Sequence, residues 1–333
     1  MANLSSLPPL RSPAKAGARR PAHGRFAGGA GDDGAGDGPP PSRGCRVGRV
    51  NGTLPLVLAL LLGGAGALWA ASPAMPTKRP AVPQRIVSIN LCADQLVLAL
   101  ADRGQIAGLT KNATDTEMSG EAAKAQGIPL LSNSAEQILA IEPDLIIGMP
   151  ASRSAALRAL PSQSYPLIDL ATANTLDEIH MSIRQTAAAV GHPDRGTRLI
   201  AQMEEELAGL PKPGNGRVAA YYQRRGYMTG TGTLIDDLMT RIGLVNLAGE
   251  LGKPPLSQLS LEEMVAARPD FLIVESATDT VTDQGSEMLH HPALQDIPRI
   301  SVPQAWTVCG SPAYTQAARS MAAQIAHIDG NRT

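Results

Sequence analysis

The chain reads Ser134-Ala135-Glu136-Gln137-Ile138-Leu139-Ala140-Ile141-Glu142-Pro143-Asp144-Leu145-Ile146-Ile147 and repeats this pattern as Ser260-Leu261-Glu262-Glu263-Met264-Val265-Ala266-Ala267-Arg268-Pro269-Asp270-Phe271-Leu272-Ile273. Each copy predicts a capped helix, a Pro-Asp turn and a buried strand. Two such units in one chain predict two similar α/β lobes. Ligand sites favour the cleft between lobes of this kind, so we expect the functional site there.

Both copies contain a helix start, a helix stop and a strand. Ser134 and Ser260 stand where an N-cap belongs, and Gln137 and Glu263 follow at the capping-box spacing. The proline of each copy ends the helix, because it lacks an amide hydrogen and restricts the preceding residue. The apolar runs that follow are typical of strands buried on both faces of a parallel sheet. The alternative is that any α/β protein contains helix–turn–strand units that look alike.

Length and charge limit the class of protein. A chain of 333 residues is long enough for two domains and additional segments. The formal net charge is −1, and the body of the chain carries no basic patch of the kind that binds nucleic acid. Aromatic residues make up only 3% of the chain, which argues against stacking platforms for single strands. We therefore expect no nucleic-acid partner.

The N-terminal region predicts export. Residues 1–53 are rich in Gly, Pro and Arg, a composition that predicts disorder. Residues 54–72 contain an uncharged apolar run, preceded by arginines and followed by small residues, which is the layout of a cleaved signal peptide. A membrane anchor is the alternative, but it needs about 20 apolar residues. Residues 73–84 form a Pro-rich linker.

The rest of the chain divides into two predicted lobes and a connector. Strand and helix patterns alternate over residues 85–171, the N-terminal lobe, and over residues 213–333, the C-terminal lobe. Residues 172–212 form a helical connector with two predicted helices, Leu176–Val190 and Asp194–Leu210. The second helix would be about 25 Å long, enough to run from one lobe to the other.

Several segments together resemble a known family. The strand Arg85–Ile89 with the loop Asn90–Gln95, both repeats, the segment Thr231–Leu238 and the stretch Trp306–Pro312 occur in this order. They resemble the periplasmic substrate-binding proteins of ABC importers for ferric siderophores, haem and cobalamin, over nearly the whole chain from residue 85. The resemblance implies two Rossmann-like α/β lobes with central, mainly parallel sheets, joined by a single long helix. It also implies a periplasmic monomer without a resident cofactor, which delivers a metal chelate to an inner-membrane permease.

The resemblance assigns a docking role to one glutamate in each repeat. In the family, an exposed glutamate on each lobe docks onto arginines of the permease, and the matching residues are Glu136 and Glu262. The alternative is that an acidic residue in the first turn only complements the helix dipole. The same placement in both repeats favours docking.

The resemblance also places ligand contacts on loops at the carboxyl ends of strands, as the open-sheet rule predicts. Arginines suit carboxylate- or catecholate-type chelates, and Tyr and Trp offer flat area against a macrocycle. Cys92 and Cys309, one in each lobe, could bridge the lobes, ligate a metal centre or remain buried thiols, and the sequence leaves these possibilities open. The candidate ligand-binding residues are Asn90, Cys92, Gln95, Arg153, Tyr222, Arg224, Arg225, Tyr227, Met228, Trp306 and Cys309.

Other functions have weaker support. The Gly-rich segment Gly226–Thr233 lacks the ending and the spacing of a phosphate loop, and no nucleophile elbow or metalloprotease helix occurs. The six histidines are scattered, so a site for a bare metal ion is weakly supported. We therefore predict an exported solute-binding component that captures a ferric siderophore or a cobalamin-type corrinoid. The alternatives are a haem- or metal-ion-binding protein of the same shape, or a two-lobe α/β enzyme.

Overall fold

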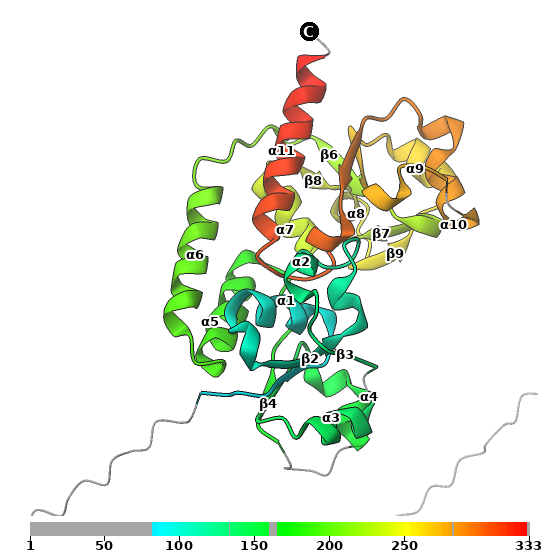
Figure 1. The fold of residues 1–333 in the computed structure, drawn as a ribbon. Coiled ribbons are helices and arrows are strands. Elements are labelled where there is room, and N and C mark those ends of the chain that lie inside the picture. Colours follow the sequence, from blue (N-terminus) through cyan, green and yellow to red (C-terminus); the bar gives the residue numbers. More distant parts are fainter. Residues whose placement is uncertain (1–81, 133, 160–164, 282, 332–333) are drawn as a thin grey trace, which may run out of the picture. The chain divides into compact units, whose positions relative to one another are not determined.

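Two parallel β-sheets, one in each half of the chain, form the framework of the protein (Figure 1). The computed structural model describes residues 82–331 apart from residues 133, 160–164 and 282. The extension 1–53, the predicted signal peptide 54–72 and most of the linker 73–84 lie outside the described residues. Among the helices of the described part, none is both long and apolar enough to cross a membrane.

The N-terminal lobe contains a five-stranded sheet in the order β3-β2-β1-β4-β5, in which every pair of neighbours is parallel. Helices follow the strands, as expected for a parallel sheet. The strands are β1 (Ile86–Ser88), β2 (Ile106–Thr110), β3 (Leu130–Leu131), β4 (Leu145–Gly148) and β5 (Leu167–Asp169), and the helices are α1 (Leu91–Leu100), α2 (Ala122–Ala125), α3 (Ala135–Ile141), α4 (Ala155–Ala159) and α5 (Leu176–Ala189).

The C-terminal lobe contains a four-stranded parallel sheet, β11-β10-β6-β8, and a separate antiparallel pair, β7 and β9. The strands are β6 (Val218–Tyr221), β7 (Tyr227–Thr229), β8 (Val245–Asn246), β9 (Leu256–Gln258), β10 (Phe271–Glu275) and β11 (Arg299–Val302). The helices are α7 (Leu234–Arg241), α8 (Leu247–Glu250), α9 (Leu261–Ala267), α10 (Gln284–Glu287) and α11 (Tyr314–Gly330).

The two sheets share one topology. In each lobe the first strand lies between the second major strand and the strand of the sequence repeat: β1 lies between β2 and β4, and β6 lies between β8 and β10. The next strand, β5 or β11, lies outside the repeat strand. The sequence repeat is thus part of a repeated lobe, and the prediction of an α/β fold with two parallel-sheet lobes is confirmed.

The helix starts of the two repeats agree with the prediction and differ in one detail. The hydroxyl oxygens of Ser134 and Ser260 accept hydrogen bonds from the third helical amides, at 3.4 and 3.2 Å. Glu263 completes a capping box by accepting from the amide of Ser260 at 2.9 Å. Gln137 instead accepts from the amide of Ser132, so the first copy has the serine cap without the reciprocal bond.

The helix ends of the two repeats are alike. Glu142 and Arg268 both adopt the left-handed conformation, with φ of 49° and 48°. A left-handed residue ends a helix and turns the chain sharply. Pro143 and Pro269 follow at once and are buried.

The aspartates after these prolines fasten each repeat strand to the first strand of its lobe. The Asp144 carboxylate accepts from the amide of Arg85 at 2.8 Å, and the Asp270 carboxylate accepts from the amide of Val218 at 2.8 Å. The amides of the same aspartates donate back to the carbonyls of Arg85 and Val218. The Pro-Asp turn therefore sets the register between two neighbouring strands.

A single helix, α6 (Pro193–Leu207), runs from one lobe to the other (Figure 1). Near its start, Arg195 forms an ion pair of 2.7 Å with Asp102 of the N-terminal lobe. Near its end, Glu206 accepts a hydrogen bond of 2.6 Å from Thr315 of α11. Both ends of the connector are therefore fixed by polar contacts.

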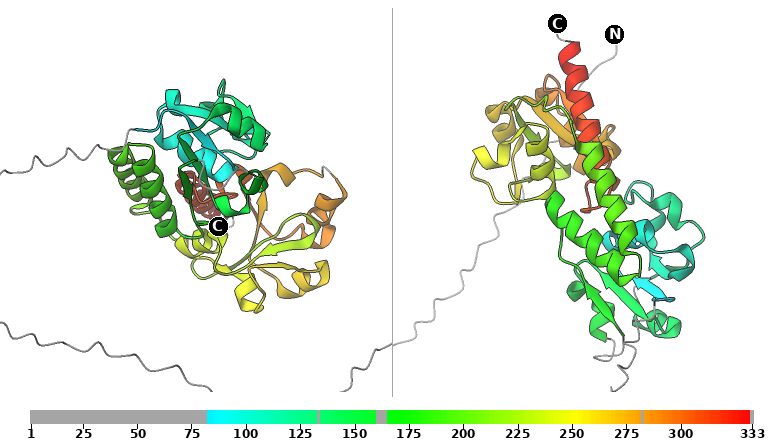
Figure 2. Two further views of the ribbon diagram at one scale, coloured as in Figure 1. Left: turned by 90° about the horizontal axis from the view of Figure 1, so that it is seen from below. Right: turned by 90° about the vertical axis from the view of Figure 1, so that its left-hand side faces the viewer.

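Helix α6 ends at Leu207, earlier than the predicted Leu210. Gly209 adopts a positive φ of 72°, which an α-helix does not accommodate. Helix α5 packs beside α6 (Figure 2). Gly196 of α6 lies so close to Ala187 of α5 that an added Cβ would stand 2.6 Å away. The close approach of the two helices stiffens the connector on the N-terminal side.

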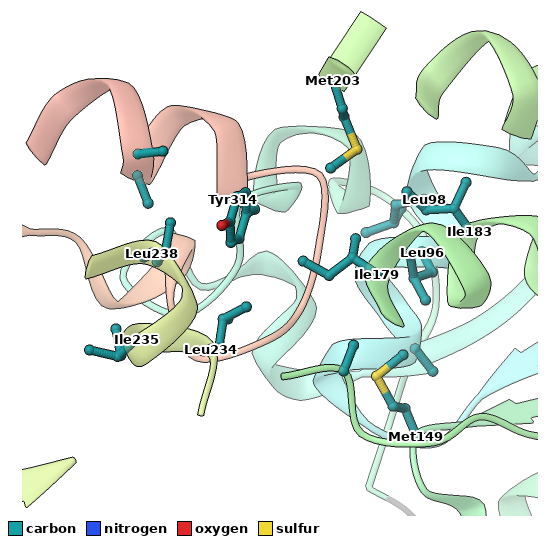
Figure 3. Packing of buried hydrophobic residues seen from close by; sticks show 14 of the residues in the cluster. Leu96, Leu98, Met149, Ile179, Ile183, Met203, Leu234, Ile235, Leu238 and Tyr314 are labelled. Carbon is teal, nitrogen blue, oxygen red and sulfur yellow. The ribbon is translucent and has the colours of Figure 1, made fainter. Parts of the chain in front are cut away.

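The two lobes share one apolar core (Figure 3). Buried Leu96 and Ile179 of the N-terminal lobe belong to the same cluster as Leu234, Leu238 and Tyr314 of the C-terminal lobe. Because protein interiors are close-packed, relative motion of the lobes would disturb these contacts. The two lobes are therefore held together by a continuous, close-packed apolar core.

Candidate functional site

A cavity of about 250 Å³ is lined by residues of both lobes. Most of its lining follows the carboxyl ends of strands, where open α/β sheets bind ligands. Residues of the N-terminal lobe are Cys92, Met149, Thr172, Ala173 and Asn174, and residues of the C-terminal lobe are Tyr221, Gln223, Thr229, Thr233, Leu234, Ile235, Glu275, Gln304, Thr307, Val308, Cys309 and Gly310.

The two repeats contribute equivalent positions to this cavity. Met149 is the first residue after β4, and Glu275 holds the same place relative to the second repeat. Both line the cavity, so the repeats supply an apolar side chain from one lobe and an acidic one from the other. Asn90 positions Met149 by donating a hydrogen bond of 2.9 Å to its carbonyl.

The cavity wall is neutral apart from one carboxylate. Among the described residues that line it, none is Lys, Arg or His. Its polar side chains are mainly amides and hydroxyls, which both donate and accept hydrogen bonds. They belong to Thr172, Asn174, Gln223, Thr229, Thr233, Gln304 and Thr307.

Glu275 is held by neutral donors. Its Oε1 atom accepts from the Tyr221 hydroxyl at 3.3 Å and from Gln223 Nε2 at 3.0 Å. Burial, and then the negative charge of Glu275, raise the pKa of Tyr221 above its usual value, so Tyr221 remains a donor. Thr229 donates to Gln223 at 3.4 Å and orients its amide.

Cys92 and Cys309 form a disulfide, with a Cα–Cα distance of 5.3 Å. The sequence left a bridge, free thiols and a metal centre open, and the structure selects the bridge. Cys92 lies on α1 of the N-terminal lobe and Cys309 on the segment before α11, so the bond joins the lobes at the cavity wall.

The segment Asn90–Gln95, predicted as a loop, is the start of a helix. Asn90 is the N-cap of α1, and its side chain accepts from the amide of Ala93 at 3.0 Å. Cys92 is therefore helical. Gln95 lies one turn further on, fully buried, and accepts from the amide of Gly120 at 3.2 Å, so it does not line the cavity.

Tyr222 and Met228, both proposed as ligand contacts, are fully buried outside the cavity lining. The Tyr222 hydroxyl donates to the carbonyl of Leu259 at 3.0 Å. The physical reason is the two-residue period of extended chain. Tyr221 faces the cavity, so its neighbour Tyr222 faces the opposite side, and Thr229 has the same relation to Met228.

Arg224, Arg225 and Tyr227 are also absent from the cavity lining. Arg224 forms an ion pair with Asp283, and Arg225 occupies a turn with a positive φ of 59°. Tyr227 is 40% exposed on the hairpin β7–β9. Arg224 and Arg225 therefore do not line this cavity.

Two further candidates are Trp306 and Arg153. Trp306 is half-buried and packs against the shared core, between the lining residues Gln304 and Thr307. Arg153 belongs to the turn Ala151–Arg153 after β4, but its side chain lies outside the described part of the structure.

Sequence reasoning missed most of the lining residues. A signal was present for Glu275, because it is an acidic residue at the carboxyl end of the apolar run Phe271–Val274. For Thr172 and Asn174 the signal was weaker, because they belong to a polar segment assigned to the connector. Within the part of the chain that the structure describes, no group of three or more His, Cys, Asp or Glu side chains is placed to hold a metal ion.

Glu136 and Glu262 are exposed at equivalent places in the first turns of α3 and α9. One turn further along, Leu139 and Val265 are apolar side chains exposed by 39% and 38%. Each lobe thus presents a small surface with one carboxylate and one apolar side chain.

A bilobal α/β framework, a single connecting helix and a cavity between the lobes form the arrangement of a substrate-binding protein. The chain belongs to the periplasmic binding protein family, whose model matches residues 86–300.

Two relatives of the chain are named for binding vitamin B12, or cobalamin. The chain is 25% identical over 268 residues to a vitamin B12-binding protein of Pectobacterium carotovorum, covering 77% of this chain and 94% of that one. It is 22% identical over 213 residues to a cobalamin-binding protein of Halobacterium salinarum, covering 62% of this chain and 58% of that one.

Solved structures agree with the fold. The haem-binding protein RhuT of Roseiflexus sp. RS-1, in apo form, has a TM-score of 0.58 and 27% identity, covering 73% of this chain and 99% of its own. The vitamin B12-binding protein BtuF of Vibrio cholerae has a TM-score of 0.56 and 17% identity, covering 74% and 98%.

Proposed function

We propose that the protein is the exported solute-binding component of an ABC importer. It captures a metal chelate, a cobalamin-type corrinoid, between its lobes and delivers it to an inner-membrane permease. Export to the periplasm through a cleaved signal peptide at residues 54–72 is part of this proposal, and so is a monomeric state.

The observation that carries the choice of ligand is the charge of the cavity wall. A corrin ring carries carboxamide side chains, which pair well with the amides and hydroxyls of Asn174, Gln223 and Gln304. Haem propionates and anionic siderophores need cationic partners, since an unpaired charge is costly to bury. None of the described lining residues is cationic. The names of the cobalamin-binding relatives support the same choice.

The size of the cavity limits how a chelate is held. A whole corrinoid is larger than about 250 Å³. The cavity therefore takes the part of the ligand that enters deepest, and the remainder lies further out between the lobes. The shared core and the disulfide restrict large closing motions, so we expect little rearrangement on binding.

Fluorescence quenching of Trp306 tests the choice of ligand. The chain has two tryptophans, and Trp69 would be removed with the signal peptide. The mature protein is titrated with cyanocobalamin, cobinamide, haem and a panel of ferric siderophores. We expect saturable quenching by the corrinoids at about micromolar affinity or tighter.

Calorimetry on Trp306→Phe provides the control, because binding should persist when the optical signal is lost. Saturation by haem or a siderophore, with no response to either corrinoid, would overturn the proposed ligand.

Docking through Glu136 and Glu262 is the second part of the proposal. The two carboxylates occupy equivalent, exposed positions on the two lobes, as a two-point contact with a permease requires. Charge pairs of this type set orientation and encounter rate more than affinity. The neighbouring Leu139 and Val265 supply apolar contact area.

The double variant Glu136→Ala with Glu262→Ala tests docking. We expect ligand affinity to stay within about twofold and uptake by cells to fall by about tenfold or more, because the altered residues lie outside the cavity. Glu205→Ala with Glu250→Ala is the matched control, since it removes two exposed carboxylates elsewhere. Normal uptake by the Glu136/Glu262 variant would remove the docking role.

A further inference from the structure

Glu275 is a carboxylate on the wall of a cavity whose other described lining residues are uncharged. It ends strand β10 and is 8% exposed. Tyr221 and Gln223 bond its Oε1 atom, and no residue in the described part of the chain bonds its Oε2 atom. Oε2 is not among the buried side-chain atoms that lack a partner, so it is accessible at the cavity and can accept a hydrogen bond from a bound group.

We propose that Glu275 selects ligands by their charge. Its carboxylate accepts a hydrogen bond from an amide N–H or a cationic group of the ligand and rejects ligands that bring a carboxylate or another anion to this wall. The inference rests on the proposed function, because it requires that the chelate enter this cavity.

The surroundings of Glu275 strengthen this selection. The two donors that hold it are neutral, so they fix the side chain without cancelling its charge. No cation among the described lining residues would offset repulsion between Glu275 and an anionic ligand. Like charges brought together in a partly buried site repel strongly, because the local dielectric is lower than that of water.

Only the C-terminal lobe presents a carboxylate to the cavity at this position, so the selection by charge acts on one side of the ligand. Met149 lines the cavity at the position of the N-terminal lobe that is equivalent to Glu275. A methionine therefore stands there in place of a second glutamate. A ligand edge that donates hydrogen bonds is therefore stabilised against the C-terminal lobe, and an apolar edge against the N-terminal lobe. Glu275 would thus orient the chelate as well as select it.

Ligand pairs that differ only in charge test the proposal. The first pair is cyanocobalamin and its derivative with one peripheral amide hydrolysed to a carboxylate. The second pair is the dipropionamide of haem and haem itself. The quantity measured is the ratio of dissociation constants, carboxylate form over amide form, by calorimetry.

Two variants change the charge, and a third is the control. Glu275→Gln keeps the shape and can still accept from Tyr221 and Gln223. Glu275→Met copies the residue of the other repeat. Glu250→Gln removes a carboxylate from the exposed surface of the same lobe, outside the cavity.

We expect the wild type to prefer the amide form by about tenfold or more, and both Glu275 variants to reduce this ratio to within about threefold. Glu250→Gln should retain the wild-type ratio. An unchanged ratio in the Glu275 variants, or a wild type that prefers the carboxylate form, overturns the inference. If only the haem pair binds, the proposed corrinoid ligand is wrong, but the haem ratio still decides the role of Glu275. If neither pair binds, the proposed function and this inference both fail.

Discussion

The two repeats agree in almost everything that builds the fold and differ where they reach the cavity. Both have a serine cap, a left-handed residue at the helix end and an aspartate that fastens the turn to a neighbouring strand. Past the repeat, the N-terminal copy continues with Gly148 and Met149, and the C-terminal copy with Val274 and Glu275. The scaffold is therefore repeated, whereas the side chains that it presents to the cavity, Met149 and Glu275, differ.

The largest expected effect comes from removing the disulfide that links the two lobes. Replacing Cys92 and Cys309 by serine removes a bond across 217 residues of chain. We expect the free energy of unfolding to fall by about 2–5 kcal/mol, because the unfolded chain regains conformational entropy. Denaturant unfolding of the oxidised wild type and the double variant measures this difference. A loss below about 1 kcal/mol would show that the shared core alone holds the lobes.

A second prediction concerns the pH dependence of stability, which depends on the surroundings of two aspartates at equivalent places in the two lobes. Asp94 is the fourth residue of α1, as Asp237 is of α7. Asp94 is fully buried and accepts hydrogen bonds from the amide and hydroxyl of Thr110, whereas Asp237 accepts from the hydroxyl of Tyr314. Burial raises the pKa of Asp94 to about 6.

A carboxyl whose pKa is raised by folding contributes stability at low pH, and this contribution is lost as pH rises through the folded pKa. We therefore expect the wild type to lose up to about 3 kcal/mol relative to Asp94→Asn between pH 4 and pH 7. Chemical unfolding at the two pH values tests this, with Glu250→Gln as the charge control. A difference between wild type and variant that is the same at both pH values would contradict the prediction.

A third prediction exchanges a residue between the repeats. Gly148 and Val274 hold equivalent places, but a Cβ at Gly148 would stand 2.8 Å from Ala151 and from Ile89. Gly148→Val should therefore cost about 1–3 kcal/mol through overpacking. Thermal unfolding of Gly148→Ala and Gly148→Val checks this, and the cost should rise with side-chain size. Equal stability of the valine variant would show that the two sites have the same room.

The smallest effect concerns the Pro-Asp turns. The Asp144 carboxylate accepts from two backbone amides, those of Gln84 and Arg85, whereas Asp270 accepts from one, that of Val218. Both aspartates are exposed, so each hydrogen bond contributes about 0.5–1 kcal/mol. We expect Asp144→Ala to destabilise more than Asp270→Ala, as measured by denaturant unfolding. A larger loss of stability in Asp270→Ala than in Asp144→Ala would show that the number of accepted hydrogen bonds does not determine the contribution of each turn.

Local features of the fold could be predicted from the sequence. Serine caps, the Pro-Asp turn and apolar strand runs act over a few residues, so the repeat Ser134–Ile147 and its second copy were visible without a structure. The helical start at Asn90 is also a local feature, since asparagine is a strong N-cap, although a loop is predicted there from the sequence.

The site could be predicted only in outline. The rule that ligands bind at the carboxyl ends of strands points to the region of the sheets that borders the cavity. Which of two neighbouring side chains faces the cavity, Tyr221 or Tyr222, depends on how the sheet packs against the other lobe. The pairing of Cys92 with Cys309 likewise depends on contacts between distant parts of the chain.

The position of the disulfide in the chain also orders the steps of biosynthesis. Cys92 belongs to the first helix of the described structure, and Cys309 follows 217 residues later, just before the last helix. The bond can close only after nearly the whole chain has been synthesised. Until then, the only other cysteine already synthesised is Cys45 of the N-terminal extension. Early removal of that extension would leave Cys309 as the sole partner of Cys92 within the chain. Formation of the disulfide would then show that the chain has been synthesised at least as far as Cys309.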